Sequence, residues 1–253
     1  MRIWIVALNT FRESVRDKVL YVLLLFALTA VLGSKAIGWI SIGQDIKIVK
    51  DFTLASMSVF GALIAIFVGT SLLYKEIDKR TLYTILSQPM RRWEFVLGKY
   101  LGLGLLLGLV VLVMALVSGL YLLVLGGKPD AAYFLAALLI YWKLLLVTSF
   151  AVLLSSMASP ILGAIVVFAL YVFGHATGVF LDLPAQFDGT FSKTLLEGLY
   201  YAFPNLGNFD IRAEAANGVP INPSYVLFAL AYGTLYSAAV LIAAVWAFEN
   251  KDV

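Results

Sequence analysis

The sequence has 253 residues, of which 62% are hydrophobic and only 13% are charged, and its mean hydropathy is +0.96. No soluble core could bury so much apolar surface, so the composition excludes a soluble protein. It predicts one membrane domain over residues 1–253, without a soluble catalytic domain. The net charge of +3 comes from basic residues in loops, which indicates topology rather than nucleic-acid binding. The absence of cysteine and the single histidine exclude disulfides, cysteine nucleophiles and a multi-histidine metal site within one chain.

The first segment, residues 1–18, has the pattern of an amphipathic helix that lies in the membrane interface. Its apolar side chains follow helical spacing, and its charged side chains lie off that stripe. A signal peptide is the alternative, but the apolar run that follows is too long and no small-x-small cleavage site is evident. We therefore expect an uncleaved elbow helix, whose apolar stripe consists of Ile3, Trp4, Ala7, Leu8, Phe11 and Val15.

Six apolar segments follow, each long enough to cross a hydrocarbon layer of about 30 Å at about 1.5 Å per residue. Residues 41–51 are expected to form a short polar loop, and residues 126–130 a turn. The run Ser155–Pro160 breaks a stretch that is too long for one helix. We expect an all-α membrane protein with six transmembrane helices, at about 19–40, 52–74, 100–125, 131–155, 160–180 and 223–248.

The distribution of Lys and Arg predicts how the chain is oriented in the membrane. Eleven of these residues fall on the side of the two termini and of residues 75–95, and six fall on the opposite side. Because the side that is richer in basic residues faces the cytoplasm, we expect both termini to be cytoplasmic.

Residues 75–95 contain the densest charge cluster of the chain and lie between two apolar segments. Within Thr81–Gln88, Leu82, Ile85 and Leu86 recur at helical spacing, and Pro89 follows as a helix stop. This pattern predicts a short amphipathic helix that lies across the membrane face. On residue types alone, an ordinary basic loop that fixes topology is favoured over a docking helix for a soluble partner.

The longest connection, residues 182–222, lies between the fifth and sixth predicted spans, on the side opposite the termini. Phe191, Leu195, Leu199 and Phe203 recur there every four residues. A segment with so many apolar side chains is unsuited to be a solvated loop. We expect short extracellular helices that lie on the outer leaflet or dip into it.

Lys143 and His175 are the ionisable residues that the predicted spans place deepest in the membrane. A charge costs about 2.5–3.5 kcal/mol or more at that depth, so such residues usually line a cavity or form pairs. Both are candidates for a polar contact in a translocation path. The alternatives are a structural lysine in a buried or hydrated site and an interfacial histidine. An intramembrane Ser–His protease would need a serine beside His175; Ser118 or Ser149 could serve only by accident, and no motif supports that activity.

Three pairs of glycines have the Gly-x-x-x-Gly spacing that permits two helices to approach closely. Packing within one subunit is the favoured interpretation, and a dimer seam is the alternative. The pairs are Gly98…Gly102, Gly104…Gly108 and Gly174…Gly178.

One long motif resembles the cytoplasmic loop of the ABC type 2 permease family, the membrane subunits of ATP-driven exporters. The similarity is strongest over residues 50–102 and is closest to the branch with permeases of nitrous-oxide-reductase maturation and gliding motility. It continues more weakly through Tyr201–Leu206 and Asn208–Asp210. The motif reads Glu76…Arg80-Thr81…Leu86-Ser87-Gln88-Pro89…Arg92-Trp93-Glu94-Phe95…Gly98-Lys99.

The resemblance implies that residues 75–95 carry a coupling helix, which contacts a separate ABC ATPase subunit. It also implies extracellular helices before the last span that close the outer mouth. The sequence has no Gly-x-x-x-x-Gly-Lys-Ser/Thr phosphate motif, which agrees with ATP binding on another subunit. The expected ATPase-coupling residues are Glu76, Arg80, Thr81, Leu82, Ile85, Leu86, Pro89, Arg91 and Arg92.

The function implied by the resemblance is that of an exporter permease in the bacterial cytoplasmic (inner) membrane, which is not itself an enzyme. Two copies would form a homodimer in the lipid and pair with two ATPase subunits that carry ATP and Mg. No cofactor, metal or nucleic acid is expected on this chain. The alternative is a non-transporting membrane subunit that transmits force to a periplasmic or envelope partner.

Overall fold

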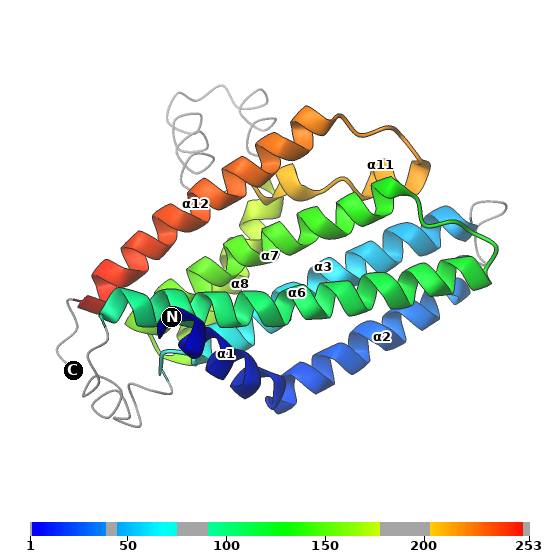
Figure 1. The fold of residues 1–253 in the computed structure, drawn as a ribbon. Coiled ribbons are helices and arrows are strands. Elements are labelled where there is room, and N and C mark those ends of the chain that lie inside the picture. Colours follow the sequence, from blue (N-terminus) through cyan, green and yellow to red (C-terminus); the bar gives the residue numbers. More distant parts are fainter. Residues whose placement is uncertain (1, 39–44, 75–90, 178–202, 250–253) are drawn as a thin grey trace, which may run out of the picture.

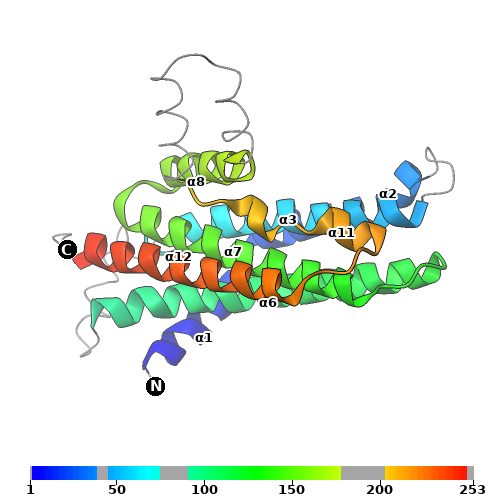
Figure 2. The same cartoon turned by 90° about the horizontal axis from the view of Figure 1, so that it is seen from above.

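The computed structural model describes residues 2–38, 45–74, 91–177 and 203–249, and all regular elements within these ranges are helices (Figure 1). Helices α2 and α6 run in one direction along an elongated bundle and α3, α7 and α12 run in the other, while α8 lies to one side of it beside α3 and α7 (Figure 1 and Figure 2). The elements are α1 (Arg2–Val15), α2 (Lys18–Gly38), α3 (Asp45–Ser71), α6 (Arg92–Val124), α7 (Ala131–Met157), α8 (Pro160–His175), the 3-10 helix η2 (Leu206–Phe209), α11 (Arg212–Asn217) and α12 (Pro223–Glu249).

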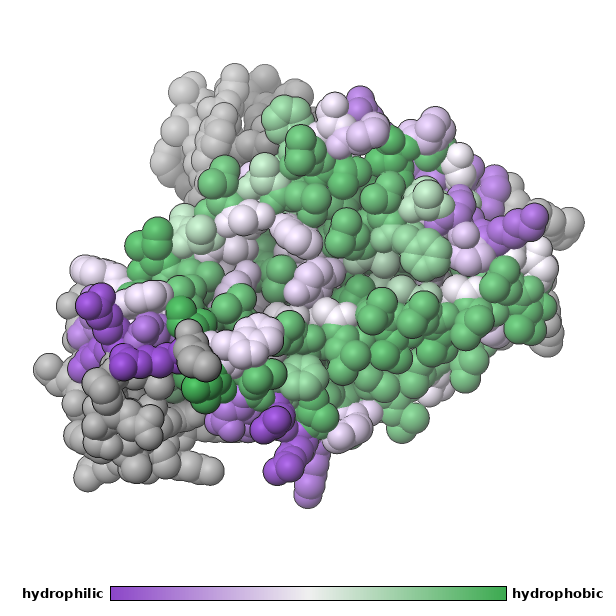
Figure 3. Space-filling model, viewed as in Figure 1, coloured by the Kyte–Doolittle hydropathy of each residue, from purple (hydrophilic) through white to green (hydrophobic). Residues whose placement is uncertain are grey.

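Helix α7 is the centre of the bundle, because it packs against α3, α6, α8 and α12. It is apolar on all sides, as expected for a helix that neighbouring helices enclose. The surface around the bundle is apolar as well. Figure 3 shows hydrophobic residues covering the middle of one face, with hydrophilic residues gathered towards its two ends. This banded surface is the one that a bilayer requires.

Within the described ranges, α3, α6, α7 and α12 are long and apolar enough to cross a membrane. The apolar helices α2 and α8 are shorter. The prediction of an all-helical membrane protein is therefore confirmed, and six apolar helices lie where six spans were expected. That all six cross the membrane stays a prediction.

Three predicted boundaries are wrong. Residues 45–51 belong to α3 rather than to a loop, because Lys50 is held there by an ion pair, 3.0 Å from Asp130 Oδ1. Helix α6 begins at Arg92 rather than near residue 100, since α1 covers its first turns and buries Lys99. Helix α8, which corresponds to the fifth predicted span, ends at His175 instead of continuing to residue 180.

Helix α1 lies across the first turns of α6, where glycines allow close contact. A Cβ atom on Gly102 would lie only 2.5 Å from the carbonyl oxygen of Ala7, and Gly98 meets the same helix. A Cβ atom on Gly108 would lie 3.3 Å from the ring of Tyr141 in α7. These two glycine pairs thus serve packing within one chain, as favoured by the sequence.

The predicted apolar stripe of α1 is divided between two environments. Ala7 is fully buried against α6, whereas the side chain of Trp4 is 54% exposed. Lys99 Nζ lies 3.4 Å from Glu13 Oε2, so a buried ion-pair partner on α6 fixes the rotation of α1. The role of α1 as an elbow helix in the membrane interface stays a prediction.

Candidate functional site

Four polar side chains meet near the middle of the bundle, and we refer to them as the Lys143 cluster: Ser58, Lys143, Tyr171 and His175. Lys143 Nζ donates to Ser58 Oγ over 2.6 Å and lies 3.2 Å from His175 Nε2. The hydroxyls of Ser58 and Tyr171 are 3.1 Å apart. Ser58 and Lys143 lie near the middle of α3 and α7, and Tyr171 and His175 lie in the last turns of α8.

The contacts of His175 determine which nitrogen of its ring carries the proton when the ring is neutral. His175 Nδ1 lies 2.8 Å from the carbonyl oxygen of Tyr171, which can only accept a hydrogen bond. Nδ1 is therefore the donor, and Nε2 is left as the acceptor for the ammonium group of Lys143. The Tyr171 and His175 ring centroids are 4.4 Å apart, so the two side chains support one another at i and i+4 of α8.

Both predicted membrane residues are thus in direct contact, and Lys143 is 1% exposed. Among the described residues, no carboxylate lies within ion-pair distance of Lys143. Its hydrogen-bond partners are a hydroxyl and an imidazole. Neutral partners offset only part of the free-energy cost of removing an ammonium group from water. The positive charge of Lys143 is therefore buried at a net cost in free energy.

An ion pair lies beside this cluster, on the segment that leads into α11. Arg212 donates to both carboxylate oxygens of Asp210, with Nε 2.7 Å from Oδ1 and Nη2 2.6 Å from Oδ2. Burial alone would raise the pKa of the Asp210 carboxyl. The hydrogen bonds and charge of Arg212, together with the charge of Lys143, outweigh burial and lower that pKa below its ordinary value.

Residues 203–212 enter the bundle with little regular structure, and α12 supplies their polar partners. Figure 2 shows this part of the chain running from beside α8 along α3 to α11. The backbone N–H of Asn205 donates to the Tyr232 hydroxyl over 3.0 Å, and the Tyr225 hydroxyl donates to the Asn208 carbonyl over 3.0 Å. Phe209 is fully buried against Gly233. Non-helical backbone at this depth is stable because protein groups satisfy it.

The expected coupling residues are only partly described. Glu76, Arg80, Thr81, Leu82, Ile85, Leu86 and Pro89 lie outside the described residues, and so does the helix pattern at Phe191, Leu195 and Leu199. Arg91 precedes α6, and its backbone N–H donates to Glu94 Oε2 over 2.9 Å. Arg92 binds the end of α12, donating to the carbonyl oxygens of Phe248 and Glu249 over 2.9 and 3.0 Å. Its guanidinium group satisfies carbonyls at a helix C-terminus.

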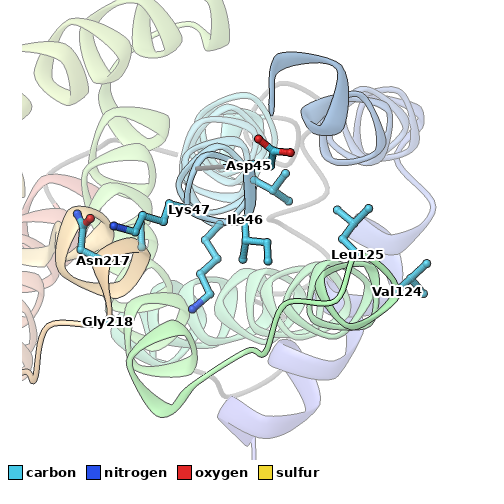
Figure 4. A pocket seen from close by; sticks show the side chains of 10 residues that line it. Asp45, Ile46, Lys47, Val124, Leu125, Asn217 and Gly218 are labelled. Carbon is cyan, nitrogen blue, oxygen red and sulfur yellow. The ribbon is translucent and has the colours of Figure 1, made fainter. Parts of the chain in front are cut away.

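A cavity of about 710 Å³ lies at the opposite end of the bundle, between the start of α3, the end of α6 and α11 (Figure 4). Lys47 and Lys50 line it together with Asn217 and several apolar residues. Among the described residues, no group of three or more His, Asp or Glu side chains could hold a metal ion. This end of the bundle offers an open surface, whereas Ser58 and Lys143 of the Lys143 cluster are buried.

Sequence reasoning identified Lys143 and His175 but missed Ser58, Tyr171, Asp210 and Arg212. The i, i+4 spacing of Tyr171 and His175 on an apolar helix was a usable signal. Ser58, rather than Ser118 or Ser149, is the serine near His175: it accepts a hydrogen bond from Lys143, which also contacts His175. Ser58 and Lys143 are 3% and 1% exposed, so this pair has the residue types of a Ser–Lys dyad but no access for a substrate.

Comparison with known proteins agrees with this membrane architecture. The sequence model of the family described as "ABC-2 family transporter protein" matches residues 4–180. A probable ABC transporter permease protein NosY of Pseudomonas aeruginosa is 29% identical over 288 aligned positions, which cover 99% of each chain. A second protein of that name, from Stutzerimonas stutzeri, is 33% identical over 121 positions, 44% of this chain and 42% of the relative. The chain is a member of the ABC-2 transporter family and has the fold of a permease membrane subunit.

Proposed function

We propose that the chain is the membrane subunit of an ATP-driven exporter in the bacterial cytoplasmic membrane. The family implies an ABC ATPase as partner, and membrane subunits of this kind are generally not catalytic themselves. In the proposed assembly, two copies of the chain pair with two ATPase subunits, which bind ATP and Mg. Both termini face the ATPases.

The observation that carries this proposal is the packing of the two long helices that flank residues 75–90 in the sequence. They connect the end of α3 to the start of α6, and these helices pack against each other. The start of α6 is tied to α12 by Arg92 and to α1 by the Lys99–Glu13 pair. A displacement applied to residues 75–90 would therefore act on several helices at once rather than on one loop.

Export and force transmission differ in what they require of the Lys143 cluster. In an exporter, Lys143 and His175 would line a path that opens between the two copies. The second candidate function, force transmission to a periplasmic partner, is favoured by one observation. Lys143 is 1% exposed and bonds to His175 within a single chain, while His175 is half-buried. A structural joint requires a buried Lys143, whereas a solute path requires water or substrate to reach it.

Co-expression with a candidate ABC ATPase subunit tests the shared part of both candidates. We expect the two proteins to co-purify, and ATP hydrolysis to depend on the ATPase subunit. The permease alone should bind no ATP, as measured by thermal shift with nucleotide. Saturable ATP binding by the isolated permease would contradict the proposal. Uptake of solute into inverted vesicles then distinguishes export from force transmission.

A further inference from the structure

The end of α8 is in contact with the chain at residues 203–206. A Cβ atom on Gly174 would lie 2.7 Å from Leu206 Cγ and 2.9 Å from the Pro204 carbonyl oxygen. The rings of Phe173 and Phe203 are 5.6 Å apart. The last turn of α8 and residues 203–206 therefore meet at one place in the fold, and Gly174 makes that close approach sterically possible.

That place adjoins the Lys143 cluster. His175 follows Gly174 directly, and Tyr171 lies one turn before His175 on α8. Their partners come from two other helices, since Lys143 belongs to α7 and Ser58 to α3. The chain after residue 203 packs on the same helices, because η2 contacts α7 and α8, and α11 contacts α3 and α7. The cluster thus connects the end of α8, on which residues 203–206 pack, to α3 and α7.

We infer that the Lys143 cluster is a mechanical joint, which fastens the end of α8, and residues 203–206 packed on it, to α3 and α7. Lys143, Ser58 and Tyr171 are positioning residues in this joint, because they act through the segment that they hold. Helix α3 leads directly to residues 75–90. If an ATPase moves those residues, as the proposed function requires, the joint carries the movement of α3 to the opposite end of the molecule.

The joint can be tested on the isolated permease, without any ATPase. The chain has no cysteine, so a single reporter at a fully buried position, Leu206→Cys, can measure opening of the 203–212 segment by its rate of maleimide labelling in lipid nanodiscs. Lys143→Met removes both hydrogen bonds of the ammonium group, and we expect labelling about tenfold faster, which corresponds to about 1.4 kcal/mol. Tyr171→Phe removes one hydroxyl and should raise the rate about fivefold.

Tyr141→Phe is the matched control. The Tyr141 hydroxyl also belongs to a half-buried tyrosine, but it donates to the Gly104 carbonyl over 3.2 Å, outside the cluster. Its removal should leave the labelling rate at the wild-type value. Wild-type rates in both Lys143→Met and Tyr171→Phe would overturn the joint. Equal acceleration in all three variants would also overturn it, because the effect would then be general loosening.

A second measurement on the complex with its ATPase tests transmission. In the wild-type permease, labelling of Leu206→Cys should differ between the nucleotide-free and vanadate-trapped states. In Lys143→Met this difference should be lost while ATP hydrolysis continues. A retained difference in Lys143→Met would contradict transmission through the joint. Absence of any complex with the wild-type permease would contradict the proposed function alone, because the first measurement still decides whether the joint exists.

Discussion

The contact between α1 and α6 predicts that adding one methyl group to a glycine of α6 destabilises the protein at Gly102 but not at Gly119. Gly102→Ala places a Cβ atom 2.5 Å from the Ala7 carbonyl oxygen and 2.6 Å from Thr10 Cβ. The first obstacle is backbone, which cannot rotate away, so α1 must shift. Gly119→Ala is the matched control, since it lies on the same helix and its Cβ atom would meet Pro129 at 3.9 Å, an ordinary contact.

The two variants share the gain in helix propensity from Gly to Ala, about 1 kcal/mol, so their difference isolates the steric term. Overpacking of a well-packed contact costs about 1–3 kcal/mol. We therefore expect Gly102→Ala to be less stable than Gly119→Ala by that amount. On the scale of proteins of about this size, each kcal/mol lowers Tm by about 2–4 °C.

Thermal unfolding of the purified permease in detergent, followed by tryptophan fluorescence, measures this difference. Labelling of a cysteine introduced at Ser14, which is buried in α1, reports separately whether α1 has left α6. The reasoning would be refuted if Gly102→Ala were as stable as Gly119→Ala. It would also be refuted if Ser14→Cys labelled at the same rate in both backgrounds.

Three further predictions concern residues 75–90, the orientation and the Asp210–Arg212 ion pair. Leu86→Asp should leave membrane insertion intact but reduce co-purification of the ATPase or uncouple hydrolysis from work; wild-type binding together with wild-type work would remove the coupling role. A cysteine at Lys128 should label from outside intact cells and one at Arg80 only after permeabilisation; the reverse pattern would invert the topology. The folded-state pKa of the Asp210 carboxyl is lowered, so its ionised form stabilises the folded protein. This stabilisation is complete above the unfolded-state pKa of about 3.9 and is lost as the pH falls through the folded-state pKa. Asp210→Asn should therefore be less stable than the wild type at neutral pH, with a Tm difference that shrinks below about pH 3.9; a pH-independent difference would contradict this.

Helix starts were predictable where the backbone itself sets them. Helices α8 and α12 begin at Pro160 and Pro223, as the sequence indicated, because proline suits the first turn of a helix and excludes the preceding residue from it. The starts of α3 and α6 were placed seven and eight residues too late, at 52 and 100 instead of Asp45 and Arg92. Hydropathy marks the part of a helix that lies in lipid, whereas a helix continues into water wherever tertiary contacts hold it.

The candidate site shows the same division. The sequence predicted that Lys143 and His175 lie deep in the membrane, because both fall within apolar segments. Since burying a charge is costly, it also indicated that they line a cavity or form pairs. That they bond to each other did not follow. Lys143 and Ser58 are 85 positions apart, and their contact depends on the rotation of α7 relative to α3. No periodicity within either segment specifies that rotation.

The sequence by itself determined that the chain belongs in a bilayer, that it is helical and in which order its apolar segments follow. Each of these depends only on composition and on local runs of residues. A chain that is 62% hydrophobic must satisfy its backbone groups in a bilayer, and helices do so within one segment. Tertiary structure alone decided which polar groups meet, which glycines face a neighbour and where residues 203–212 re-enter the bundle. These features depend on the rotation and depth of one helix relative to another, and packing across the whole bundle fixes both.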